Sequence, residues 1–282
     1  MTTATATPAA PAKAPAARKS TKLQGLQVFM ENKLAVFGVC LLLILLAFSF
    51  IGPMFYVTDQ IHTDLSISQM EPSAEHPLGT DMVGYDQLGR LMKGGQTSII
   101  VGLFAGIIAT TIGTLYGAIA GFVGGWIDAI MMRIVDALMS VPVLIIIMSA
   151  LSWLGTSRLI RGEALSLRTR EYVVAMRGMG GSMPRAIRTH IVRNTIGTVI
   201  VNATFQVADA VLYVAYLSFL GLGAQPPATD WGAMLSNSQS HVYSGNWWLL
   251  YPPGVLIILL VLSFNFIGDG LRDAFEVRLR KR

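Results

Sequence analysis

The sequence predicts an all-α fold: a polytopic bundle of membrane-spanning helices with about six spans. Hydrophobic residues make up 53% of the 282 residues, charged residues make up only 13%, and the mean hydropathy is +0.56. This composition is too apolar for a soluble domain of that length. The chain also contains several apolar runs long enough to cross a hydrocarbon core of about 30 Å as helices.

Sequence motifs exclude several classes of site. The single Cys40 lies in an apolar run, so an internal disulfide framework is excluded. The chain lacks the phosphate-loop pattern GxxxxGK[ST], the HExxH pattern and the CxxC pattern, and its four histidines are scattered without ligand spacing. We therefore expect no catalytic residue, no metal site, no cofactor bound by this chain and no nucleic-acid partner.

The N-terminal region divides into a tail and a first span. Residues 1–22 are rich in Ala, Thr and Pro and carry four basic residues, which predicts a disordered basic tail on the cytoplasmic side. Residues 23–75 are assigned to the N-terminal span and the start of an extracellular loop. The apolar run 34–51 lacks a small-residue cleavage pattern, which favours an uncleaved span over a cleaved signal peptide.

The next segment changes from acidic to apolar. Residues 52–96 carry six acidic residues against Arg90 and Lys93, which favours the outside face. Residues 97–122 are apolar and rich in glycine. Because glycines four residues apart lie on one stripe of a helix, they allow another helix to approach closely, within the bundle or at a subunit interface. The predicted packing stripe is Gly113, Gly117 and Gly121.

The C-terminal half reads as two spans. Residues 196–224 form one span, 225–246 form a loop without Lys or Arg, and 247–268 form another span that opens with two tryptophans. In this topology 19 of the 21 Lys and Arg residues lie inside. The positive-inside bias therefore predicts cytoplasmic N- and C-termini.

The region between these halves is too short for its topology. An even number of crossings must separate residues 122–128 from residues 171–194, yet the apolar run 129–154 has 26 residues, enough for roughly one crossing at about 1.5 Å per residue. We expect a shortened third and fourth helical hairpin whose turn lies near Ser149, Ser152 and Gly155. Arg133 and Asp136, three residues apart, are expected to form a local ion pair.

A polar stripe runs along the predicted fifth span. Asp209 is the ionisable group deep in that span, and it follows Asn202 and Gln206 and precedes Tyr213 at spacings of about one helical turn. A carboxylate facing lipid would cost several kcal/mol. Two interpretations remain open: the stripe lines a translocation path, or it makes hydrogen bonds between helices.

Residues 171–194 predict a helix, a bend and a second helix on the cytoplasmic side. Gly180 and Gly181 supply the backbone freedom for the bend, and Pro184 suits the first turn of the second helix. A basic, amphipathic element of this shape suits docking into a groove of another protein. The alternative is a solvated basic loop between spans.

Four strings carry a resemblance to a known family. Glu171, Ala175 and Gly180, with Met176 where a second Ala is usual, resemble the EAA loop of ABC-importer permeases. The strings HPLGTD (76–81), SFLGLGAQPPATDWGAML (218–235) and FNFIGDGLRDAF (264–275) are similar to the oligopeptide and dipeptide permease family, specifically its second permease subunit. The similarity covers roughly residue 21 to the C-terminus.

The resemblance implies a pore subunit, not an enzyme, with a type I ABC-importer permease fold over residues 76–282. It implies a location in the bacterial inner membrane and four kinds of partner: the lipid bilayer, a homologous second permease, two ATPase subunits that bind ATP and Mg, and an extracellular substrate-binding protein. The substrates would be short peptides, although relatives also carry nickel chelates or glutathione. The implied contacts with the ATPases are Glu171, Ala175, Arg177, Gly180, Gly181 and Arg185.

One departure from the family concerns the hairpin. Relatives place a longer apolar hairpin between the positions of Pro142 and Trp153, and this chain is some fifteen to twenty residues shorter there. The alternative function is an ATPase-independent secondary transporter or another integral-membrane protein. Such a protein would need internal repeats or clustered intramembrane charges, for which only Asp209 qualifies.

Overall fold

A computed structural model describes residues 21–140, 152–225 and 227–280, and this part of the chain is helical, without a named strand. The predicted all-α membrane fold is confirmed. Four helices in the described residues are long and apolar enough to cross a membrane: 33–55, 183–219 and 247–276, together with α4 (Gln87–Val123).

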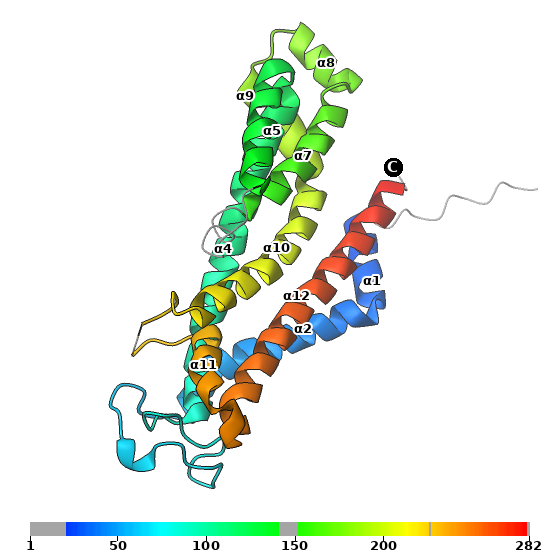
Figure 1. Ribbon diagram of the computed structural model, residues 1–282. Helices are drawn as coiled ribbons and strands as arrows, with labels where there is room; N and C mark the ends of the chain where they lie inside the picture. Colours follow the sequence, from blue (N-terminus) through cyan, green and yellow to red (C-terminus); the bar gives the residue numbers. More distant parts are fainter. Residues whose placement is uncertain (1–20, 141–151, 226, 281–282) are drawn as a thin grey trace, which may run out of the picture.

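One of the four, α4, runs along most of the molecule (Figure 1) and packs against α7 and α10. Its 37 residues correspond to roughly 55 Å of helix, more than the thickness of a bilayer core. The Asp86 side chain caps its first turn by accepting from the Gly89 N–H at 2.7 Å. It ends at Gly124, whose φ of +68° lies in the left-handed region that favours glycine.

The N-terminal span is preceded by a separate helix, α1 (Thr21–Glu31), which packs on α12 (Trp247–Arg280). Between α1 and the span, Asn32 caps the next helix through its Oδ1, and its Nδ2 donates to Asp273 Oδ2 at 3.1 Å. The predicted tail of residues 1–22 lies outside the described residues except for its last two positions. Those two positions begin α1, and the predicted disorder of the tail stays a prediction.

Two of the four candidate spans contain a π-helical segment. The first, 33–55, consists of α2 (Lys33–Leu46), η1 (Ala47–Ile51) and α3 (Gly52–Phe55). The other, 183–219, consists of α9 (Met183–Ala186), η3 (Ile187–Val192) and α10 (Arg193–Phe219), so its helix begins 13 residues before the predicted span at residue 196. As predicted, Pro184 lies in the first turn of that helix, where its missing N–H costs little.

The end of the bundle where α4 begins is closed by a short helix, α11 (Trp231–Ser238), which packs between α4, α10 and α12. Trp231 is fully buried: its indole N–H donates to the Leu91 carbonyl oxygen at 2.8 Å, and its backbone N–H donates to Ser98 Oγ at 3.1 Å. Residues 225–246 were predicted to be a loop. They do connect the candidate spans 183–219 and 247–276, but α11 and η4 (Gln239–Ser244) lie within this segment, which corrects its description as a plain loop.

The acidic loop that precedes α4 is fixed by its own polar contacts, and it contains one short helical turn, η2 (Leu65–Ile67). Asp86 is 4% exposed; its Oδ2 accepts from the Tyr56 hydroxyl at 2.8 Å and lies 2.9 Å from His76 Nδ1. Burial and the neighbouring Asp86 raise the pKa of Tyr56 to about 12. Tyr56 therefore stays protonated and joins the end of the first span to the start of α4.

Two shorter helices follow α4 on either side of residues 141–151, which lie outside the described part of the chain. They are α5 (Gly125–Ser140) and α7 (Trp153–Leu167), with 16 and 15 described residues, or roughly 24 and 22 Å. Within the described residues, each is shorter than the roughly 30 Å of a full hydrocarbon core, and the predicted shortened hairpin stays a prediction. Of the predicted turn positions, Ser149 lies outside the described residues and Ser152 precedes α7, but Gly155 lies inside α7, which corrects its assignment to the turn.

Two ion pairs join this hairpin. Arg161 donates through Nε and Nη2 to the two carboxylate oxygens of Asp128 at 2.5 and 2.6 Å, and Arg158 donates to Asp136 Oδ1 at 2.5 Å. The predicted pair between Arg133 and Asp136 was wrong. The antiparallel course of α7 brings Arg158 opposite Asp136, and this partner is invisible to an argument from spacing within one helix.

Candidate functional site

The first feature of the site is a helical bend at one end of the bundle. Figure 1 shows α8 (Glu171–Gly178) and α9 at the end opposite the acidic loop. Glu171 is the first residue of α8 and is exposed. The helix ends in a paired hydrogen-bond motif, because the Gly181 N–H donates to the Met176 carbonyl oxygen and the Gly180 N–H donates to that of Arg177, both at 3.0 Å.

The two glycines serve different purposes in that motif. Gly180 has a φ of +79° with open space around an added Cβ, so the backbone conformation requires a glycine there. An added Cβ on Gly181 would instead lie 1.9 Å from Met176 Sδ and 2.8 Å from the Met176 carbonyl oxygen. The sequence predicted a bend at these positions, and the structure places it there.

One side of the bend is anchored to the rest of the bundle by an apolar cluster. Val173, Ala186 and Ile191 are fully buried with residues of α4 and α7 in that cluster. Arg177 adds a polar link, since its Nη2 donates to the Phe122 carbonyl oxygen at 3.1 Å and its guanidinium lies 4.1 Å from the Phe122 ring centroid. The bend is therefore fixed to the end of α4.

The other side of the bend exposes apolar side chains beside basic ones. Val174 and Met179 are 56% and 82% exposed. Ala175 and Arg185 are also exposed. Exposed apolar side chains beside charged ones are a feature of many protein–protein interaction sites.

The glycine stripe of α4 lies against α7. A Cβ added at Gly113 would lie 2.6 Å from the Trp153 carbonyl oxygen, one at Gly117 would lie 2.2 Å from that of Ser157, and one at Gly121 would lie 2.6 Å from that of Arg161. The absent side chains therefore let two helix backbones meet. The structure places this contact within one chain.

The polar stripe of α10 divides into two parts. Asn202 Nδ2 donates to Thr156 Oγ1 at 2.8 Å, and the buried Gln206 donates through Nε2 to the Ser152 carbonyl oxygen at 3.1 Å, so both bind α7. Further along α10 toward α11, Asp209 is exposed and Tyr213 is half-buried. The division falls where α7 begins, because α7 covers the stripe only as far as its first residues.

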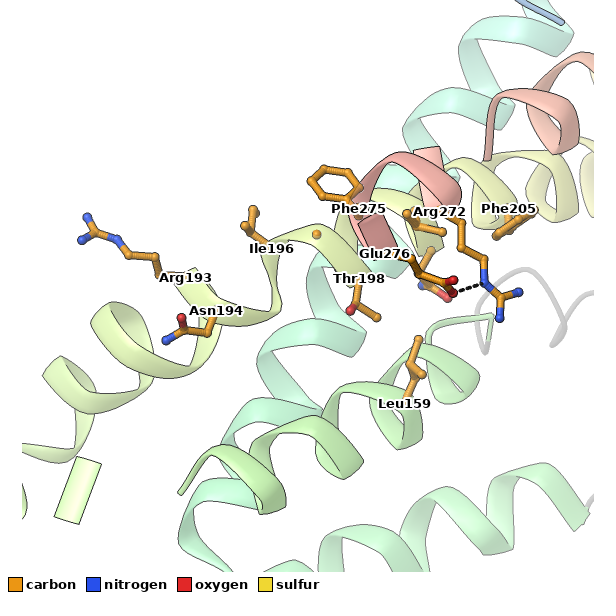
Figure 2. A pocket seen from close by; sticks show the side chains of 12 residues that line it. Leu159, Arg193, Asn194, Ile196, Thr198, Phe205, Arg272, Phe275 and Glu276 are labelled. Atoms are coloured by element: carbon orange, nitrogen blue, oxygen red, sulfur yellow. Dashed lines mark hydrogen bonds and ion pairs between the residues drawn. The ribbon is translucent and has the colours of Figure 1, made fainter. Parts of the chain in front are cut away.

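A crevice of about 760 Å³ lies between α7, α10 and the last turns of α12. Figure 2 shows Phe205 and Thr198 of α10, Leu159 of α7, and Phe275 of α12 around it. Arg272 and Glu276 form an exposed ion pair at its edge, with Nε to Oε1 at 3.3 Å. Asn202 also lines this crevice.

Sequence reasoning missed the α12 side of the crevice. Arg272 and Glu276 are four residues apart, the spacing of a helical ion pair, and this signal could have placed them on one helix face. Nothing in the sequence indicates that this face lies opposite α10. Among the described residues, no group of three or more His, Cys, Asp and Glu side chains could hold a metal ion.

Comparison with known proteins identifies the family. Residues 144–281 match the model of the binding-protein-dependent transport system inner membrane component, and residues 24–72 match the N-terminal transmembrane domain of oligopeptide transport permease C. The dipeptide transport system permease protein DppC of Bacillus subtilis (strain 168) is 37% identical over 268 residues, covering 89% of this chain and 84% of the relative.

Two further relatives give the same picture. The oligopeptide transport system permease protein OppC of Salmonella typhimurium (strain LT2) is 40% identical over 271 residues, covering 89% of each chain. A putative peptide permease protein of Brucella suis biovar 1 is 40% identical over 269 residues, with the same coverage. This chain therefore belongs to the family of binding-protein-dependent transport system inner membrane components.

Proposed function

We propose that this chain is one of two permease subunits of an ATP-driven importer of short peptides. The relatives that it matches over nine-tenths of its length are named as dipeptide or oligopeptide permeases. The chain would form half of the translocation pore and would leave ATP hydrolysis to partner subunits. Its partners would be a homologous second permease, two ATPase subunits that bind ATP and Mg, and an extracellular binding protein.

The observation that carries this proposal is the bend formed by α8 and α9. One side of the bend is exposed, and the other side is packed against α4 and α7. A coupling element requires both. The exposed Glu171, Ala175 and Arg185 would contact an ATPase groove, and Arg177 would transmit the movement to α4. A rigid-body displacement of the ATPases would then change the helix packing around the pore.

The charge distribution supports an orientation with both termini in the cytoplasm of a bacterial inner membrane. The segments that form and adjoin α8 and α9 are rich in arginine: Arg168, Arg170, Arg177, Arg185 and Arg188. Figure 1 shows the acidic loop at the opposite end of the bundle. Positive residues are retained on the cytoplasmic side of membrane proteins. The bend would therefore lie where ATPase subunits can reach it.

The exposed part of the polar stripe is the second element of the proposal. A carboxylate exposed on the surface of a span is costly in lipid, so Asp209 would face the aqueous path or the second permease. Asn202 and Gln206 would hold α7 against α10 and so set the width of that path. The crevice that Asn202 lines would form the cytoplasmic part of the translocation path.

Reconstitution tests the proposal. The chain is co-expressed with a second permease, two ATPase subunits and a peptide-binding protein, and uptake of a labelled dipeptide into proteoliposomes is measured. We expect uptake only when all subunits and ATP are present. Uptake by the chain without any ATPase would contradict the proposal and would favour a secondary transporter.

A further inference from the structure

A second cavity lies at the outer end of the chain, far from the crevice. Its volume is about 270 Å³, and it lies between the first turns of α4, the loop at residues 81–85, α11 and the start of α12. Met234 and Leu249 form an apolar wall, while Asn237 at its edge is exposed. The cavity is smaller than typical sites for drug-sized ligands, which are about 300–1,000 Å³.

Two charged side chains line this cavity, Arg90 and Asp81. Arg90 is 6% exposed, and its guanidinium lies 4.4 Å from the Tyr85 ring centroid. Its Nε lies 3.3 Å from Asp81 Oδ2, whereas its Nη1 is buried and has no hydrogen-bond partner in the part of the chain that the structure describes. Buried guanidinium groups are normally satisfied by several partners, so this one has an unused capacity to bind an anion.

Asp81 holds the guanidinium in place from the loop. Its Oδ1 accepts from the backbone N–H groups of Val83 and Tyr85 at 3.0 and 2.9 Å, so the carboxylate is fixed by the backbone. The other oxygen, Oδ2, lies 3.3 Å from Arg90 Nε, and Nη1 of the same guanidinium has no partner among the described residues. The planar fork of a guanidinium matches the oxygens of a carboxylate.

We propose that this cavity binds the C-terminal residue of a short peptide on the outer side, with Arg90 as the group that recognises its carboxylate. The side chain of that residue would pack on Met234 and Leu249, and the rest of the peptide would extend past Asn237. The volume fits one terminal residue and excludes a whole oligopeptide. This inference rests on the proposed function, because it assumes a peptide substrate.

Binding to the chain alone tests the inference without requiring transport. The purified full-length chain is placed in lipid nanodiscs, and binding of the dipeptide Ala-Leu and of its C-terminal amide is measured by isothermal titration calorimetry. We expect Ala-Leu to bind at least about tenfold more tightly than the amide, because the amide cannot form the charge-assisted pair. Equal affinities, or acetate binding as tightly as Ala-Leu, would overturn the inference.

Matched variants identify the group responsible. Arg90→Gln should remove the preference for the free carboxylate, whereas Lys93→Gln, which removes the same charge from an exposed position on the same helix, should keep it. Asp81→Asn should tighten binding of Ala-Leu several-fold, since an Asn oxygen can still accept from the loop backbone while the competing charge is lost. An unchanged preference in Arg90→Gln would overturn the assignment.

A variant that leaves Arg90 intact covers the case in which Arg90→Gln does not fold. Asn237→Trp should block the edge of the cavity and weaken Ala-Leu binding at least about tenfold, and undiminished binding would overturn the inference. Failure of the reconstituted importer to take up peptides would refute the proposed function through a separate measurement. The two failures are therefore distinguishable.

Discussion

Arg177 of α8 contacts Phe122 in the last turn of α4 in two ways. The guanidinium lies 4.1 Å from the ring centroid, and Nη2 donates to the Phe122 carbonyl oxygen at 3.1 Å. Phe122 is 3% exposed, so it cannot move without the helix that carries it. The pair connects the proposed coupling element directly to α4. Both α7 and α10 contact this helix.

Arg177→Leu tests this connection. The substitution removes a charged hydrogen bond and a cation–π contact, each worth roughly 1 kcal/mol, so we expect peptide uptake per ATP hydrolysed to fall about thirtyfold. Assembly with the ATPase subunits should persist. The control is Arg188→Leu, which removes the same charge from an exposed position in η3. An unchanged ratio of uptake to hydrolysis in Arg177→Leu would show that the pair does not transmit the movement.

Gly180→Val tests the bend itself. Gly180 has a φ of +79° and open space around its Cα, so the cost of a side chain is conformational, about 1–2 kcal/mol, and not a clash. We expect normal membrane insertion, with ATP hydrolysis uncoupled from transport. Gly178→Val is a suitable control, because Gly178 lies in the helix, also with open space. Normal transport by Gly180→Val would exclude the bend as the coupling element.

Gly117→Ala tests the contact between α4 and α7. An added Cβ would lie 2.2 Å from the Ser157 carbonyl oxygen and 2.9 Å from the Arg161 backbone nitrogen, and neither backbone atom can rotate away. We expect a loss of stability of about 1–3 kcal/mol, measured as a lower Tm in detergent. Gly162→Ala, at a position on α7 with open space, should leave Tm unchanged or raise it. An unchanged Tm in Gly117→Ala would mean that the helices separate without cost.

The spans could be predicted because their signal is local. An apolar run such as 34–51 identifies a span whatever it packs against, and the structure has a helix there. The four-residue spacing of the α4 glycines likewise predicts a packing stripe from one helix alone. Its partner could not be predicted, because α7 carries Arg158 and Arg161 and resembles a polar helix in sequence.

The parts that sequence reasoning missed depend on contacts between distant segments. The eight residues of α11 are too few for a clear helical period, and the helix is stabilised by the hydrogen bonds of Trp231 to α4. Asp136 pairs with Arg158, 22 residues away, in place of the nearer Arg133. The crevice likewise needs α10 and α12 together, and no pattern within either helix indicates the other.

Asp209→Asn tests the proposed path. Asp209 is exposed on α10 beyond the start of α7, where a carboxylate could meet the cationic amino terminus of a peptide. We expect the variant to weaken transport of free peptides more than transport of N-acetylated peptides, which lack that charge. Asn202→Ala serves as the comparison, since Asn202 bonds to Thr156 and should affect both substrates equally. Equal loss for both substrates in Asp209→Asn, with reduced thermal stability, would favour a packing role.

The last prediction concerns the depth of the hairpin formed by α5 and α7. Trp153, the first residue of α7, lies against Gly113, which is 26 residues after the start of α4, or roughly 39 Å along that helix from its outer end. Ser152 is therefore expected to lie far from the outer surface and close to α10, whose Gln206 donates to its carbonyl oxygen at 3.1 Å.

Cysteine labelling measures this depth in a Cys40→Ala background. A cysteine at Ser152 should react poorly with a membrane-impermeant thiol reagent added outside, whereas one at the exposed Ala74 of the acidic loop should react readily. A cysteine at Thr169, exposed just before α8, should react only from inside. Fast outside labelling at Ser152 would mean that the hairpin crosses the whole membrane, although residues 129–154 are too few for two full crossings. Outside labelling at Thr169 would place α8 away from any cytoplasmic ATPase, and the coupling proposal would fail with the topology.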